Sequence, residues 1–255
     1  MLAEALTFAD WRAAARTLLA AGVLPQDVEW REPGDVQAGL FDEAAPPALP
    51  QARAGTPFHV PPAFVKLAEV VACHRSPRRW TLLYAALWRL THGEKHLLNV
   101  PSDPLTHELG LMRGAVRRDV HKMHAFVRFR LCQDEEGEHY VAWHRPDHRI
   151  VRLAAPFFQR RFSVLRWTIL TPDESAFWDG QTLHYGEGAP VSAAPDSDAL
   201  ENLWRTYYRA IFNPARIKLK TMTRELPRRH WATLPETAII PQLLAEAPMR
   251  VDAMI

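Results

Sequence analysis

Residues 204–231 hold the side chains best suited to bind nucleic acid. This segment, WRTYYRAIFNPARIKLKTMTRELPRRHW, contains one acid, Glu225. Its eight basic residues are Arg205, Arg209, Arg216, Lys218, Lys220, Arg224, Arg228 and Arg229. Its five aromatic residues are Trp204, Tyr207, Tyr208, Phe212 and Trp231. Basic groups attract phosphate whatever the base sequence, and aromatic rings can stack on unpaired bases. The segment therefore predicts a nucleic-acid partner, although the aromatic residues are equally typical of a helix that completes the core.

A second basic cluster spans residues 113–130, RGAVRRDVHKMHAFVRFR. On a helix, Arg117 is an i,i+4 neighbour of both Arg113 and His121, which gives a ridge of positive charge. Arg128 and Arg130 are expected to share one face of a following strand. The alternative interpretation is an ordinary solvated surface. The DNA-binding candidates from the two clusters are Arg117, Arg118, His121, Lys122, Arg128, Arg216, Lys218, Lys220 and Arg224. Asn213 joins them, because Asn213-Pro214 is typical of an N-cap and first helical residue that would position the last helix.

Residues 37–41, QAGLF, predict a different kind of contact. Gln37 followed by the adjacent pair Leu40 and Phe41 resembles the QxxLF peptide with which bacterial repair and replication proteins dock on the sliding clamp. Such a peptide needs a mobile tether, a glutamine and two apolar anchors. The alternative is that Leu40 and Phe41 pack on the folded body.

Catalytic and metal-binding templates are mostly missing from the sequence. GxSxG, GxGxxG, GxxxxGK[ST] and HExxH do not occur, and we expect no cofactor. His144 and His148 have no carboxylate or cysteine at ligand spacing, so we expect no metal. The acids and serine of TPDESAFWDG, residues 171–180, could act as acid and base, but turn and cap roles explain them as well. Cys73 and Cys132 lie far apart and favour a reducing, cytoplasmic setting.

The periodicity predicts helices, then a sheet, then helices. We expect an N-terminal helical segment at 1–31, a Pro/Gly-rich linker at 32–62 and a single domain at 63–248. Within that domain we expect helices at 63–125, a mostly antiparallel sheet of about four strands at 126–186, and helices at 196–247. The last strand is expected to bend at Asp179-Gly180. This order indicates the α+β class.

Composition sets broad bounds on the class of protein. The 255 residues are 47% hydrophobic and 24% charged, as in ordinary globular proteins. The net charge is only +2, but residues 1–50 carry eight acids and three arginines, so the remainder is basic. No run of about 20 apolar residues occurs, so we expect no membrane partner.

Several long blocks resemble an uncharacterised bacterial family of DNA metabolism or repair proteins. The blocks are HKMHAFVRFR (121–130), YVAWHRPDHRIV (140–151), APFFQRRF (155–162), RWTILTPDESAFWDG (166–180) and IFNPARIKLKTMTRELPRRHW (211–231). Members of that family are encoded beside a DNA-modification radical-SAM protein, and some are fused ahead of a family-X (type-4-like) uracil-DNA glycosylase. The sequence stops at Ile255 without a glycosylase half, which is typical of a separated module or a stand-alone member.

The resemblance implies a DNA-binding accessory module in DNA repair, working with a uracil-DNA glycosylase or a radical-SAM partner. Two alternatives remain open. One is an enzyme acting on DNA or nucleotides, with His121, Lys122, Asn213 and Glu225 as candidate active-site residues if folding brings them together. The other is a protein-interaction scaffold for the radical-SAM partner.

Overall fold

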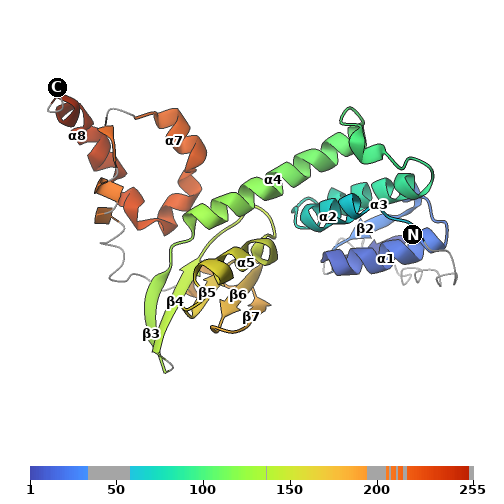
Figure 1. Ribbon diagram of the computed structural model, residues 1–255, viewed down its shortest axis with the longest axis horizontal. Coiled ribbons are helices and arrows are strands. Elements are labelled where there is room, and N and C mark those ends of the chain that lie inside the picture. Colours follow the sequence, from blue (N-terminus) through green and yellow to red (C-terminus); the bar gives the residue numbers. More distant parts are fainter. Residues whose placement is uncertain are drawn as a thin grey trace, which may run out of the picture. The chain divides into compact units, whose positions relative to one another are not determined.

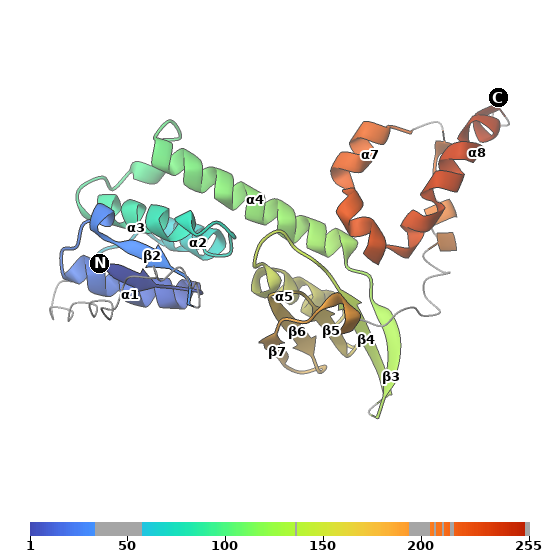
Figure 2. The same cartoon turned by 180° about the vertical axis from the view of Figure 1, so that it is seen from behind.

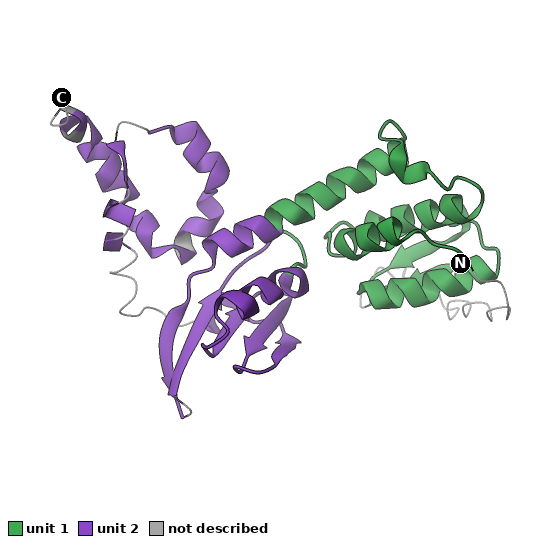
Figure 3. Ribbon diagram, viewed as in Figure 1, with its two compact units in different colours: residues 1–119, 147–150 green, residues 120–146, 151–255 purple. Residues whose placement is uncertain are grey.

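The structure is a computed structural model that describes residues 1–33, 58–135, 137–193, 205–206, 208–210, 212–214 and 217–252 (Figures 1 and 2). The chain divides into two compact units (Figure 3). Unit 1 comprises residues 1–119 and 147–150, and unit 2 comprises residues 120–146 and 151–255. The expected α+β class is confirmed. None of the described helices is both long enough and apolar enough to span a membrane.

Unit 1 is built mainly from helices. They are α1 (Phe8–Ala20), α2 (Pro62–Val71), α3 (Arg78–Thr91) and the first part of α4 (Pro104–Phe126). Two short strands, β1 (Leu2–Glu4) and β2 (Glu29–Arg31), pair in parallel. Thr7 caps α1. The Thr7 hydroxyl accepts a hydrogen bond from the Asp10 amide at 3.2 Å, and the Asp10 carboxylate accepts one from the Thr7 amide at 2.9 Å. The two residues therefore form a reciprocal capping box.

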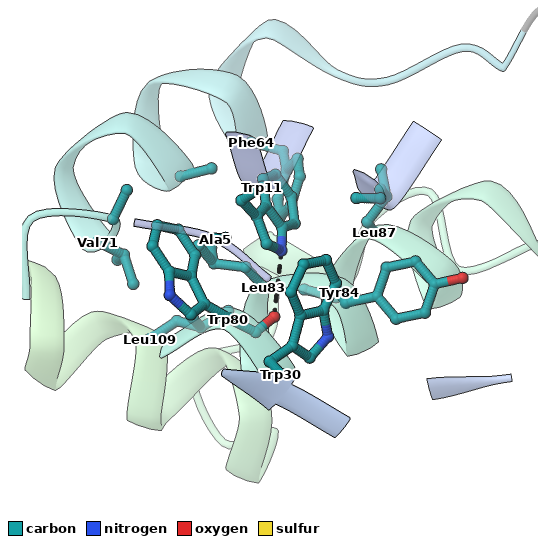
Figure 4. Close-up of a cluster of buried hydrophobic side chains, with 14 of the residues drawn as sticks. Ala5, Trp11, Trp30, Phe64, Val71, Trp80, Leu83, Tyr84, Leu87 and Leu109 are labelled. Atoms are coloured by element: carbon teal, nitrogen blue, oxygen red, sulfur yellow. Dashed lines mark hydrogen bonds between the residues drawn. The ribbon is translucent and has the colours of Figure 1, made fainter. Parts of the chain in front are cut away.

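Aromatic side chains fill the core of unit 1 (Figure 4). Trp11 and Trp80 stack with ring centroids 6.4 Å apart, and Trp11 Nε1 donates a hydrogen bond to the carbonyl oxygen of Trp80 at 3.2 Å. Trp30 and Phe64 also lie against Trp11. Residues 1–31, which were expected as a separate segment, thus share one core with α2 and α3, because the two buried tryptophans that they contribute need apolar partners.

Asp103 caps helix α4. Asp103 Oδ1 accepts hydrogen bonds from the amides of Leu105 and Thr106, both at 3.0 Å, which satisfies two otherwise unpaired donors of the first turn. The helix continues unbroken through Gly110 and Gly114. The boundary between the two units falls within α4, after Asp119.

Unit 2 contains a five-stranded sheet in the order β3-β4-β5-β6-β7. The strands are β3 (Arg130–Asp134), β4 (Gly137–Trp143), β5 (Trp167–Leu170), β6 (Glu174–Trp178) and β7 (Leu183–Glu187). Helix α5 (Val151–Arg161) connects β4 to β5, and this pair is parallel, whereas the other pairs are antiparallel.

The expected number of about four strands was too low, because the segment expected as one bent strand forms both β6 and β7. Asp179 Oδ1 accepts hydrogen bonds from the amides of Gln181 at 2.7 Å and Thr182 at 2.6 Å, and Gly180 has a φ of 97°. A turn of this kind reverses the chain completely instead of bending it.

The C-terminal part of unit 2 is again helical. It contains α7 (Leu219–Glu225), short 3-10 helices at Arg228–Thr233 and Pro235–Ile239, and α8 (Ile240–Asp252). Because α7 begins at Leu219, Pro214 is not its first residue, although Pro214 itself stands in a 3-10 turn directly after Asn213. The cap expected at Asn213 stays a prediction. Lys218 stands at the N-cap position and makes no capping hydrogen bond with its side chain.

Gly188 offers a test of the packing in unit 2. A Cβ added at Gly188 would overlap the carbonyl oxygen of Pro172, a backbone atom that the neighbouring hydrogen bond from the Ala189 amide to Thr171 holds in place. We expect Gly188→Ala to lower the free energy of unfolding by about 1–3 kcal/mol. Urea denaturation followed by tryptophan fluorescence measures this loss. Gly186→Ala is the control, because its added Cβ has no atom within 4 Å, and equal stabilities of the two variants would contradict the packing described.

Candidate nucleic-acid interface

The outer face of α4 carries three exposed arginines in unit 1. Arg113, Arg117 and Arg118 take part in no hydrogen bond or ion pair within the described part of the chain. The opposite face is buried and consists of Leu109, Met112, Val116 and Asp119, at spacings of three and four residues. This periodicity directs the arginines away from the core.

The acids of α4 do not pair with these arginines. Glu108 lies 2.9 Å from Arg78. Residues 109–126 contain a single acid, Asp119. Its side chain lies on the core side, where only 2% of the residue is exposed, and its Oδ2 accepts the His148 amide at 2.8 Å. The two next candidates along α4 belong to unit 2, where His121 is exposed and Lys122 is half-buried.

Arg128 has a different role from the one expected. It lies before β3, which begins at Arg130, so the two arginines do not share a strand face as expected. Only 17% of its side chain is exposed, and Arg128 Nη2 lies 2.8 Å from Oε1 of buried Glu236. Arg128 Nη1 also donates to the carbonyl oxygen of Ala125 at 2.7 Å. Arg128 therefore stabilises the packing of unit 2, and we leave it out of the candidate interface.

The C-terminal candidates lie in unit 2. Lys218 and Lys220 are exposed, and so is Asn213. Arg224 is also exposed, but its Nε lies 2.8 Å from Oε1 of Glu225, which neutralises part of its charge. Arg216 and the clamp-peptide residues Gln37, Leu40 and Phe41 lie outside the described residues.

Sequence reasoning missed a charged network in unit 1. Glu32 accepts two charged hydrogen bonds, one from Arg79 Nη2 and one from Arg149 Nη2, each at 2.7 Å. The Arg79 side chain is completely buried and also lies over the Trp80 ring. Burial alone would raise the pKa of Glu32, but the hydrogen bonds from the two arginines outweigh burial and lower the pKa. The network joins the end of β2 to the start of α3 and to residues 147–150.

Two histidines stack beside this network in unit 1. The ring centroids of His74 and His148 are 4.3 Å apart, with an angle of 30° between the planes. Burial lowers the pKa of His148 to about 4, with further contributions from His74, Arg75 and Arg118 that outweigh the opposing charge of Asp147. Burial and then the charge of Arg79 lower the pKa of His74. Both rings are therefore expected to be neutral near pH 7.

A second imidazole pair lies in unit 2. His144 is 1% exposed and stacks on His230 with ring centroids 5.3 Å apart. Neither ring nitrogen of His144 has a hydrogen-bond partner in the described part of the chain. Burial, and then the charges of His230 and Arg229, lower the pKa of His144 from 6.5 to about 3. Near-parallel stacked rings cannot both direct their in-plane lone pairs at one ion, so the pair does not form a metal site.

This buried imidazole predicts a pH-dependent stability of unit 2. The unfolded chain binds a proton on His144 at a higher pH than the folded chain, so the stability decreases as the pH falls from 6.5 towards 3. We expect His144→Phe to weaken this dependence. Urea midpoints between pH 7 and pH 4 measure it, and His121→Phe, at an exposed position, is the control. A pH profile unchanged by His144→Phe would contradict the assignment.

The fold and these surfaces define an α+β protein with a basic helix face. The described residues contain no group of three or more histidines, cysteines or acids that could hold a metal ion. Residues 77–236 match the family model described as a domain of unknown function, DUF4130. This match covers more than half of the chain, so the chain belongs to the DUF4130 family. The search of curated proteins and the search of solved structures each found no match.

Proposed function

We propose that the protein binds DNA through the outer face of α4 and serves as an accessory module in DNA repair or metabolism. The observation that carries this proposal is the set of three exposed arginines, Arg113, Arg117 and Arg118, none of which forms an ion pair with an acid in the described part of the chain. Fixed positive charge of this kind attracts a polyanion and releases its counterions.

Helix geometry fits contact with the phosphate backbone. Arg113 and Arg117 are about 6 Å apart along the helix axis, and a DNA strand carries about one phosphate per 3.4 Å of duplex axis. Long arginine side chains can therefore reach neighbouring phosphates. Residues 109–126 contain no asparagine or glutamine, the side chains that pair with adenine edges. We therefore expect binding with little dependence on base sequence.

The partners in this proposal follow from the resemblance of the long sequence blocks. We propose that the module acts in the cytoplasm beside a uracil-DNA glycosylase or a radical-SAM enzyme, with residues 37–41 as a contact for the sliding clamp. An enzyme is less well supported. Its candidate residues His121, Asn213 and Glu225 are exposed, and Glu225 is hydrogen-bonded to Arg224.

A titration of labelled single- and double-stranded DNA with the full chain tests the proposal. The titration is repeated at several salt concentrations. We expect log Kd to rise linearly with log salt, with a slope of at least about 2.7 for three phosphate contacts. An absence of binding at low salt would contradict the proposal and favour the scaffold alternative.

A further inference from the structure

The His74–His148 pair has a defined tautomer. The backbone amide of Arg75 donates to His148 Nδ1 at 3.2 Å, and the amide of Ser76 donates to His74 Nδ1 at 3.1 Å. A neutral imidazole that accepts at Nδ1 carries its proton on Nε2. Each ring is therefore a hydrogen-bond donor at Nε2.

These two donors are free to bind a ligand. Neither Nε2 atom has a hydrogen-bond partner in the described part of unit 1. Neither atom is buried, so both are accessible to solvent. Both Nδ1 atoms face consecutive amides of one turn. The ring geometry therefore directs both Nε2–H bonds away from that turn.

The charges of two arginines lower the pKa of His148. Arg118 does so from the outer face of α4, and Arg75 from the turn between α2 and α3. The charge of Asp147 opposes their effect on the pKa of His148. Arg75 Nε donates a hydrogen bond to the carbonyl oxygen of Asp147 at 3.0 Å. Asp119 is occupied by the amide of His148, and Glu32 by its two arginines. An anion at the pair would therefore meet the two Nε2–H donors beside Arg75 and Arg118, with the charge of Asp147 acting against it.

We propose that His74 and His148, together with Arg75 and Arg118, form a binding site for a phosphate group of the nucleic acid. This inference deepens the proposed function and rests on it. Arginines supply charge and planar donors to phosphate oxygens, and the two Nε2–H groups supply fixed donors. The buried Glu32 network holds the segment 147–150 in place, so the donors are ordered before the ligand arrives.

Inorganic phosphate provides the first test. Proton–nitrogen NMR of the histidine side chains reports each Nε2, and His→Phe variants assign the signals. We expect phosphate to shift the Nε2 signals of His74 and His148 saturably while leaving exposed His96 unchanged. If all three signals stay unchanged, the inference is overturned.

A second arm compares DNA ligands and variants. We expect His148→Phe, which keeps a stacking ring but removes the donor, to weaken DNA binding by about tenfold. His148→Gln restores a donor and is expected to recover part of the loss, whereas His96→Phe, at an exposed position of unit 1 outside the candidate interface, should bind as the wild type does. Oligonucleotides of one sequence with a 5′-phosphate or a 5′-hydroxyl identify the phosphate. Equal affinities indicate an internal phosphodiester, and a preference for the 5′-phosphate indicates a terminal monoester.

The two proposals fail in different ways. If His148→Phe and wild type bind DNA equally while Arg113→Ala/Arg117→Ala binds more weakly, the phosphate site is overturned and the proposed function stands. If the wild type binds no DNA but inorganic phosphate shifts both signals, the proposed function is overturned and the anion site remains.

Discussion

Replacement of Glu32 with alanine is expected to lower the free energy of unfolding of unit 1 by about 3–5 kcal/mol. Glu32 is the carboxylate between Arg79 and Arg149, and each guanidinium lies 2.7 Å from it. The Arg79 side chain has no exposed surface, so it cannot regain water when its partner is lost. The Arg149 side chain is 28% exposed, so water can replace part of its lost interaction with Glu32.

Hydrogen exchange followed by mass spectrometry measures this effect in each unit. We expect faster exchange in peptides from α2 and α3 and unchanged exchange in peptides from β5 to β7. Glu29→Ala is the matched control, because Glu29 forms an exposed ion pair with Arg31 that is expected to contribute less than about 1 kcal/mol. Equal, small effects of the two substitutions would contradict the structural role of the network.

Acid should reproduce part of the Glu32 effect. The pKa of Glu32 is lower in the folded chain than its usual 4.5, so the unfolded chain binds the proton first as the pH falls. The stabilisation from Glu32 is therefore complete above about pH 4.5 and is lost progressively below it.

The second large effect is expected for DNA binding. We expect the triple variant Arg113→Ala/Arg117→Ala/Arg118→Ala to bind DNA on the order of 500-fold more weakly at roughly 0.1 M salt, since counterion release strengthens binding about eightfold for each phosphate contact. Fluorescence anisotropy with a labelled duplex measures this loss. Fold integrity should be retained, because all three side chains are exposed.

A control variant separates local contact from net charge. Arg12→Ala/Arg16→Ala/Lys66→Ala removes the same charge from exposed positions on α1 and α2 of the same unit. We expect this variant to bind within about threefold of the wild type, because charges beyond about 10 Å are screened at this salt. Similar losses in both triple variants would show that only net charge matters.

Local signals in the sequence predicted much of the fold. The helical patterns at 63–125 predicted the region of α2, α3 and α4, and Asp179-Gly180 predicted a bend where the turn before β7 lies. The α+β class followed from the order of helical and alternating patterns. The extra strand was missed because a bend and a complete turn have the same local residues.

The roles of the charged residues could not be predicted in the same way. Arg128 and Glu236 are 108 positions apart, and Arg149 and Glu32 are 117 positions apart. No local pattern indicates such pairings, because they depend on which segments pack together. The run His74 to Arg79, HRSPRR, was a signal for a charged site, but only the folded chain brings it to His148.

The salt dependence of the two triple variants tests the central claim most directly. The claim is that the arginines of α4 contact DNA phosphates. It predicts that Arg113→Ala/Arg117→Ala/Arg118→Ala reduces the slope of log Kd against log salt by about 2.7, while the control on α1 and α2 keeps the wild-type slope. Equal slopes for the wild type and both variants would contradict the claim.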